Sequence, residues 1–317
     1  MRVHLLACIL GGLCLDLYAQ EPIAKTLKEA QVLVKQGHYE QTMDMLGPVL
    51  KSSALGAEDR GKALMLIATA YQEEGRFSES HRALDQSLGL LRGYQQYARD
   101  YADGLTTLSV LYRDTGDADA MKQTAMKALQ LYAQANDYEG LANIYVVLAQ
   151  YSVNRRKAVD ARRYVALAAG EFAQFGTLAD RNRIAMTDLQ AGIALLEGHS
   201  MLAVANYRQS LDLRIKSNGK EHPETGWGYM ELGKADLQAG DVRSALADMK
   251  EGLSILAQTE GTVHVAYLYS EIAYSEALAA DGQRSEARRI QADATQALTK
   301  LHGDQCVRCQ INAIALR

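Results

Sequence analysis

The feature that most constrains this chain is a turn signal that recurs at nearly constant intervals. Six of the signals are glycines in a polar setting, and Arg156 fills the seventh place. They stand at Gly37, Gly75, Gly116, Arg156, Gly198, Gly240 and Gly282, and the successive intervals are 38, 41, 40, 42, 42 and 42 residues. A fixed period of about 20–50 residues is the signature of repeat proteins. The chain is therefore predicted to stack about seven copies of one supersecondary unit.

Apolar residues at helical spacing flank each turn. In the second unit Leu64, Ile67 and Tyr71 lie on one helical face before Gly75, and Leu88 belongs to a second stripe after it. Glycine ends a helix readily because it tolerates the left-handed conformation of a C-terminal cap. The chain has only 3 prolines, and 48% of its residues are hydrophobic. Each unit is therefore predicted to be a pair of antiparallel helices, and the fold to be all-α.

Small residues recur at two fixed places in the units. Seven residues before the turn stand Ala68, Ser109, Ala149, Ala191 and Gly233, and five after it stand Ser80, Ala161, Ala203, Ala245 and Ala287. A small side chain lets two helices approach closely enough to interlock. A large residue there would overpack the hairpin, at a cost of roughly 1–3 kcal/mol.

These offsets resemble the tetratricopeptide-repeat (TPR) pattern, as Ala68, Tyr71, Gly75, Phe77 and Leu88 illustrate in the second unit. The longer period, together with the linker LRIKSNGKEHPETG over residues 213–226, resembles the kinesin-light-chain-like branch of that family. A faded copy of the linker occurs over residues 301–304. The resemblance covers residues 23–317 and is weaker in the first, fourth and seventh units. It implies an all-α, right-handed superhelical solenoid of about seven hairpins over residues 23–305, with turns near residues 37, 75, 116, 156, 198, 240 and 282.

Such a solenoid implies a function in binding, because the first helix of each pair lines a concave groove suited to a peptide or a partner helix. The chain is thus expected to be a non-catalytic interaction scaffold for a protein or peptide partner. In the usual register the groove-facing residues are Thr69, Gln72, Thr106, Arg113, Gln150, Asn154, Asp188, Trp227, Met230, Lys234 and Gln238. Trp227, the only tryptophan, is either a binding anchor or a packing residue of the adjacent hairpin.

The first twenty residues have the layout of a secretory signal peptide. Arg2 and His4 precede an apolar run over residues 5–15, and Ala19 is a plausible last residue before cleavage. The run is too short for a stable membrane span. Residues 1–20 are thus predicted to direct export to the periplasm or the cell exterior, without a stable membrane span after removal. The alternative is a buried first helix in a cytoplasmic protein.

The last twelve residues, 306–317, are predicted to form a short helix that caps the solenoid, whose final repeat would otherwise expose its apolar face. They begin with Cys306 and Cys309. In an oxidising compartment these two thiols could form a disulfide. The alternatives are half of a metal site or a redox pair, which would make the chain an enzyme subunit. A structural disulfide or two ordinary thiols is the preferred interpretation, with no metal and no cofactor.

Composition and motifs bound the remaining functions. The net charge of -4 and the pI near 6.0 disfavour nucleic acid as a partner, because phosphate contacts need a basic surface. The sequence contains no glycine-rich phosphate loop, nucleophile elbow or zinc-protease motif. His222 with its acidic neighbours is interpreted as an inter-repeat linker, in which Pro223 begins a helix. The basic residues over 155–163 are interpreted as a solvated helix face, with an acidic partner as the alternative.

Overall fold

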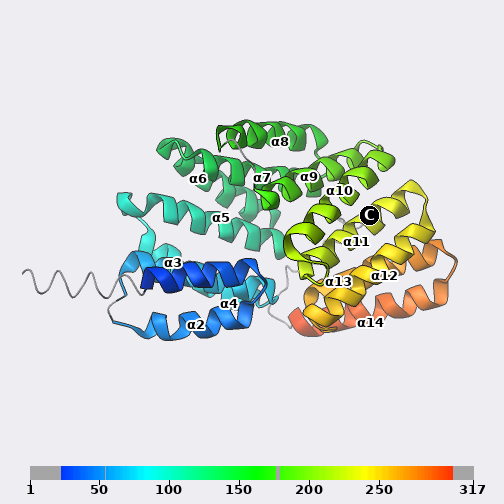
Figure 1. The fold of residues 1–317 in the computed structure, drawn as a ribbon, viewed down its shortest axis with the longest axis horizontal. Coiled ribbons are helices and arrows are strands. Elements are labelled where there is room, and N and C mark those ends of the chain that lie inside the picture. The colour runs from blue at the N-terminus through cyan, green and yellow to red at the C-terminus, as the bar shows by residue number, and fades with distance from the viewer. Residues whose placement is uncertain (1–22, 54, 176–178, 303–317) are drawn as a thin grey trace, which may run out of the picture. The chain divides into compact units, whose positions relative to one another are not determined.

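The computed structural model describes residues 23–53, 55–175 and 179–302, and within them helices are the regular elements (Figure 1). This confirms the all-α prediction. The chain divides into two compact units, Met1–Thr107 and Leu108–Arg317. The predicted signal peptide and capping helix, with Cys306 and Cys309, lie outside the described residues.

The first unit begins with a helical stretch over residues 23–35 and ends within α5. Its further elements are α2 (Tyr39–Lys51), α3 (Ala57–Glu73), α4 (Phe77–Leu91), the short η1 (Gln95–Tyr97) and the first part of α5 (Ala98–Asp114). Leu27 and Ala30 of the first stretch share one core with Leu46 of α2 and Ile67 of α3. Each helix therefore buries its apolar stripe against the helices next to it.

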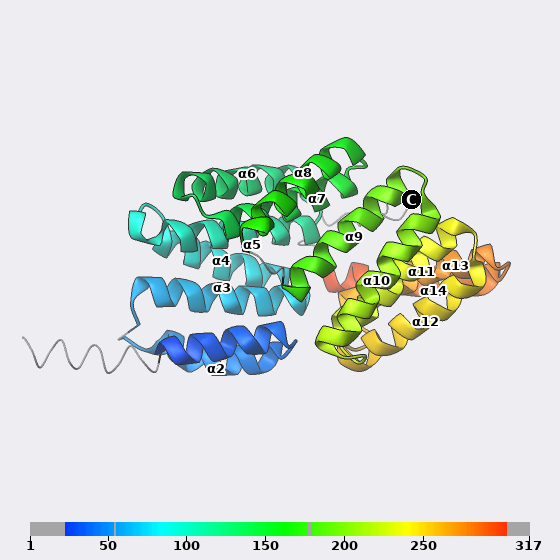
Figure 2. The same ribbon diagram turned by 45° about the horizontal axis from the view of Figure 1, so that its top comes forward.

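The second unit continues with the end of α5 and runs to α14. Its further elements are α6 (Ala118–Ala135), α7 (Tyr138–Asn154), α8 (Ala158–Phe172), η2 (Ala173–Phe175), α9 (Asp180–Leu196), α10 (Ser200–Asn218), α11 (Pro223–Ala239), α12 (Val242–Thr259), α13 (Val265–Ala280) and α14 (Arg284–His302). Consecutive helices from α6 onward contact each other, and the first helices α7 and α9, and likewise α11 and α13, contact directly across hairpins (Figure 2). The first helices thus adjoin each other within the pair α7 and α9 and within the pair α11 and α13.

All seven predicted turn residues stand between two helices and have a positive φ, including Arg156 at 56°. Gly240 shows the reason: it caps α11 in the left-handed conformation, and its N–H donates to the backbone oxygen of Leu237. Arg156 makes the equivalent bond to Val153, at 2.9 Å. The turn geometry is therefore kept where the glycine is missing.

The small residues on both sides of the turns are buried. At Gly233 of α11 an added Cβ would lie 2.5 Å from Met249 Cγ and 3.1 Å from the backbone oxygen of Ala245, both on α12. The two helices of this hairpin therefore approach too closely for any side chain at that position. The structure thus agrees with the packing argument made from the sequence.

Candidate functional site

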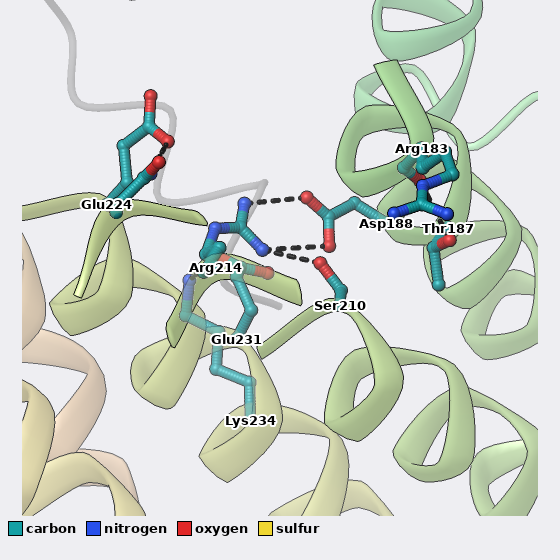
Figure 3. Close-up of polar contacts among 9 residues, drawn as sticks. Arg183, Thr187, Asp188, Ser210, Arg214, Glu224, Glu231 and Lys234 are labelled. Atoms are coloured by element: carbon teal, nitrogen blue, oxygen red, sulfur yellow. Dashed lines mark hydrogen bonds and ion pairs between the residues drawn. The ribbon is translucent and has the colours of Figure 1, made fainter. Parts of the chain in front are cut away.

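A polar cluster joins three consecutive helices of the second unit, α9, α10 and α11. Figure 3 shows the guanidinium of Arg214 on α10 pointing toward the carboxylate of Asp188 on α9. The Arg214 Nη2 lies 2.7 Å from Asp188 Oδ2, and Nη1 lies 3.2 Å from Oδ1. Arg214 Nη1 also donates to Ser210 Oγ at 2.5 Å. The two-point contact fixes the plane of the guanidinium, which a single-point lysine contact could not do.

A glycine on the neighbouring first helix α11 makes room for this cluster. A Cβ added to Gly228 of α11 would lie 3.0 Å from Arg214 Cδ. A Cβ added to Gly192 of α9 would lie 3.0 Å from Val153 and 3.8 Å from the hydroxyl oxygen of Tyr207. Arg214 of α10 can therefore approach α11 closely, whereas the close contact at Gly192 is with Val153 of α7. This explains how a residue of a second helix reaches a first helix.

Burial gives the Arg214–Asp188 pair more weight than a surface ion pair. The two side chains are only 12% and 21% exposed. Burial raises the pKa of Asp188, and Arg214 partly offsets that rise by favouring the charged carboxylate. Burial alone would lower the pKa of Arg214, but Asp188 together with the charges of Glu224 and Glu231 outweighs it, and the pKa is raised. The pair is therefore a fixed ion pair, held away from bulk water.

The cluster continues onto α11 through Glu231. Its carboxylate lies 3.0 Å from Lys234 Nζ, and the two side chains are 33% and 28% exposed. Tyr207 of α10 also hydrogen-bonds to Glu231. Burial, followed by the charges of Glu231 and Asp188, raises the pKa of Tyr207 well above its usual value. The phenol is therefore neutral and donates to the carboxylate. Charged groups of both signs thus lie in fixed positions on this part of the molecule.

Four of the predicted groove residues on the second unit's helices belong to or adjoin this cluster. Asp188 and Lys234 form the contacts just described. Trp227 is half-buried and packs against a core cluster that includes Met230, Met249 and Leu256. Gln238 is exposed near the end of α11.

Two of the predicted groove residues are in the core instead. Met230 is 0% exposed, so the prediction that it faces solvent is wrong. The physical reason is the position of α12: Met230 lies four residues after Gly226, and both approach Gly252 of that helix. Gln72 is 7% exposed and is likewise misplaced, because it lies four residues after the fully buried Ala68 and shares its face of α3.

The remaining predicted groove residues make local contacts on their own helices. Thr69 and Thr106 donate to backbone oxygens four residues earlier, at 3.1 and 2.9 Å. Gln150 donates to Asn154 at 3.0 Å on α7. Arg113 lies 2.7 Å from Asp114 on α5. These residues are not brought together by any contact described above.

Sequence reasoning missed the residues that the second helix contributes. Arg214, Ser210 and Tyr207 all lie on α10, whereas only first helices were searched for groove residues. A usable signal was present for Arg214, because Gly228 interrupts the apolar pattern of α11 where its side chain lies. Glycines inside a helix pattern indicate close approach of another group.

Other candidate sites from the sequence have ordinary structural roles. His222 caps α11 through Nδ1, which accepts the N–H of Glu224 at 3.2 Å, as expected of a linker residue. In the basic segment, Arg162 pairs with Glu197 at 2.6 Å. Among the described residues, no group of three or more His, Cys, Asp or Glu side chains could hold a metal ion. None of the described helices is long and apolar enough to cross a membrane.

The fold is that of an all-α repeat solenoid built from TPR-like helical hairpins. No protein-family model matches the sequence, and no curated protein matches it either. Among solved structures, a Rap protein complexed with Competence and Sporulation Factor is similar, with a TM-score of 0.67 and 11% identity over 93% of this chain and 82% of that chain. The apo form of RapI has a TM-score of 0.60 and 13% identity over 88% and 99% of the two chains. A signal transduction ATPase with a tetratricopeptide repeat sensor from Pyrococcus horikoshii has a TM-score of 0.51 and 12% identity, over 89% of this chain and 47% of its own. These similarities confirm the TPR-like fold.

Proposed function

We propose that the second unit is a non-catalytic scaffold that binds a protein or peptide on the layer formed by α7, α9, α11 and α13. The observation that carries this proposal is the part-exposed Glu231–Lys234 ion pair on α11, which lies beside the buried Arg214–Asp188 pair between α9 and α10. The solved TPR-like solenoids support it, since one of them is a Rap protein complexed with Competence and Sporulation Factor. The first helices of a stacked hairpin array present one continuous surface, which suits an extended partner.

The energetic argument is preorganisation. Ordering a long charged side chain on binding costs about 0.5–1.5 kcal/mol. Arg214 is already held by Asp188 and Ser210, and Lys234 by Glu231. Their ordering is therefore complete before a partner arrives. Trp227, half-buried on the same helix as Lys234, adds an aromatic side chain of the kind enriched in binding hot spots.

An ion-pair exchange tests the surface without removing any charge. In the Glu231→Lys/Lys234→Glu protein the pair is kept but its direction is reversed on the first-helix layer. The matched control reverses Lys220 and Glu251, which pair at 2.8 Å between the linker and α12. Both proteins and the wild type are used as bait in native extract, and each captured protein is then titrated against all three.

The expected result is a partner that binds the wild type and the control alike, and the α11 exchange at least about tenfold more weakly. Circular dichroism must show that the three proteins have the same helix content. A partner that is lost only with the control, or that binds all three equally, would place binding elsewhere and overturn the proposal.

We also propose that the mature protein is exported. The support is the apolar run over residues 5–15 after a basic start, followed by Ala19. N-terminal sequencing of the natural product tests this. A mature chain that begins within a few residues of Gln20 is expected, and one that keeps Met1 would favour the cytoplasmic alternative.

A further inference from the structure

Two histidines occupy equivalent positions in consecutive hairpins of the second unit. The linkers Gly219-x-x-His222 and Gly261-x-x-His264 lie 42 residues apart, the same interval that separates the turns. In both, the glycine has a positive φ, 92° and 85°. In both, the histidine is the N-cap of a first helix, α11 or α13. Sequence reasoning identified the first copy and a faded one over residues 301–304, but not the copy with Gly261 and His264.

Each imidazole caps its helix through the same atom. His222 Nδ1 accepts the backbone N–H of Glu224 at 3.2 Å, and His264 Nδ1 accepts that of Ala266 at 3.2 Å. A ring nitrogen accepts a hydrogen bond only when it carries no proton, so the capping imidazole is neutral with its proton on Nε2. Protonation of Nδ1 would turn the acceptor into a donor facing a donor. It would also place a positive charge at the positive end of a helix.

The surroundings of His264 favour this tautomer. Its Nε2 lies 3.5 Å from Glu260 Oε2 at the end of α12, and the two side chains are 13% and 11% exposed. A carboxylate at Nε2 keeps the proton there and leaves Nδ1 free to accept. The charged residues next to His222 in the sequence are Lys220, Glu221 and Glu224; Lys220 pairs with Glu251 of α12, and Glu224 accepts a hydrogen bond from Asn218 of α10.

Other helices of the same unit are capped by aspartate. Asp117 accepts from Ala120 N on α6, Asp137 from Gly140 N on α7, and Asp241 from Ser244 N on α12, each at 3.0 Å. Hydrogen bonds from Ser244 lower the pKa of Asp241, so that this cap stays charged in mild acid. The second unit therefore contains two kinds of cap, of which only the histidine kind changes protonation between about pH 5 and 8.

We propose that His222 and His264 form a pH-sensitive pair of caps, so that mild acid releases the first turns of α11 and α13 together while the aspartate-capped helices stay closed. The capped state holds no proton on Nδ1, and the released state takes one up. Acid therefore shifts the balance toward release. Both helices belong to the layer on which partner binding is proposed, but the device is a property of the protein alone and does not depend on that function.

Amide hydrogen exchange at pH 7.5 and 5.5, corrected for the intrinsic exchange rate, tests the proposal on the whole protein. Protection of the first turns of α11 and α13 is expected to fall about two- to tenfold at pH 5.5, in keeping with the contribution of one cap. Protection of the first turns of α6, α7 and α12 should hold within about twofold. Nitrogen NMR of the two imidazoles at pH 7.5 should show an unprotonated Nδ1.

The decisive variant is His222→Asn/His264→Asn, because asparagine caps a helix well but does not titrate. It should keep the protection at pH 7.5 and lose the drop at pH 5.5. Asp236, whose pKa is raised to about 6 at the other end of α11, is replaced by asparagine in both proteins so that its titration does not contribute. The proposal is overturned if the drop in the protein that carries Asp236→Asn alone is no larger at α11 and α13 than in the aspartate-capped helices, or if the protein that also carries both histidine substitutions keeps the drop.

Discussion

The contact between α11 and α12 is close enough that one methyl group should destabilise it. Gly252 lies within α12, and a Cβ added there would lie 2.8 Å from the backbone oxygen of Gly226 and 3.0 Å from Met230 Sδ. The oxygen belongs to the helical backbone of α11, so relief requires the whole helix to shift. Met230 is 0% exposed and has no route into solvent. Gly252→Ala is therefore expected to push the two helices apart.

Two opposing effects set the size of the change. Replacing glycine by alanine in an open helix stabilises it by about 1 kcal/mol. Overpacking a filled core costs about 1–3 kcal/mol, and a contact that includes backbone belongs at the upper end of that range. We expect Gly252→Ala to lower the free energy of unfolding by about 1–2 kcal/mol. The matched control is Gly170→Ala in α8, where nothing lies within 4 Å of the new methyl, and the expected gain is about 0.5–1 kcal/mol.

Urea unfolding followed by two probes measures both changes. Trp227, the only tryptophan, packs against the cluster that contains Met230, so its fluorescence reports on this hairpin. Circular dichroism reports on all helices. The urea midpoint should fall for Gly252→Ala and rise for Gly170→Ala. If Gly252→Ala is as stable as the wild type or more so, the close approach of α11 and α12 is not as described and the packing argument fails.

Three further predictions concern single groups. Burial, followed by the charge of the hydrogen-bonded Asp248, raises the pKa of Asp236 to about 6. The free energy of unfolding of the wild type should therefore fall as pH rises from about 4 to 6. Asp236→Asn should remove that fall and raise the free energy of unfolding, measured with urea, by about 1–2 kcal/mol at pH 7; an unchanged pH profile would contradict this. Arg214→Ala should lower the free energy of unfolding by about 2–4 kcal/mol, because it leaves the Asp188 carboxylate without its partner. Asp188→Leu/Arg214→Met, which removes both charges, should lower it by less than about 1 kcal/mol. Equal urea midpoints for the two variants would refute this. Arg156→Gly should raise the melting temperature, with a gain of about 0.5–1 kcal/mol, since φ is 56° there; a lower melting temperature would show that the side chain stabilises the turn by more than its backbone costs.

The fold was accessible from sequence because its signals are local and repeated. A glycine such as Gly240 ends a helix by a backbone requirement that does not depend on distant contacts. The alanine five residues later, Ala245, recurs at the same place in most units and indicates that the two helices of the hairpin approach closely. Even Arg156 could be recognised, since its interval from Gly116 and Gly198 fits the period when its residue type does not. The division into two units within α5 had no counterpart in the sequence pattern.

The site was only half accessible because the exposure of a side chain depends on the helix packed against it, which the register of its own helix does not show. Asp188 and Lys234 were predicted to face the groove from the register of the family they resemble, and both make polar contacts in the structure, to Arg214 and Glu231. Met230 was misplaced because register does not reveal that Gly226 and Gly252 bring α12 against that face of α11. Arg214 was missed because its guanidinium contacts Asp188, a residue 26 positions earlier on another helix. Side chains that reach across from a neighbouring helix cannot be assigned from the period of their own.

An interval of 42 residues separates the last four turns from one another and also separates the two histidine caps. Each of the hairpins that begin with α11 and α13 therefore has a histidine cap at one end of its first helix and a glycine turn at the other. The turn before each second helix depends on backbone conformation, which pH does not change. The cap before α11 and the cap before α13 depend on a ring nitrogen, which pH does change. A hairpin such as α11–α12 therefore has a histidine cap at the start of its first helix that acid releases, whereas at the turn the aspartate cap of α12 stays charged and protonation of Asp236 does not loosen the fold. Acid should accordingly release the first turns of α11 and α13, which follow the linkers, and leave the hairpin turns intact. The amide protection near Gly240 should therefore not fall when that of the first turn of α11 does.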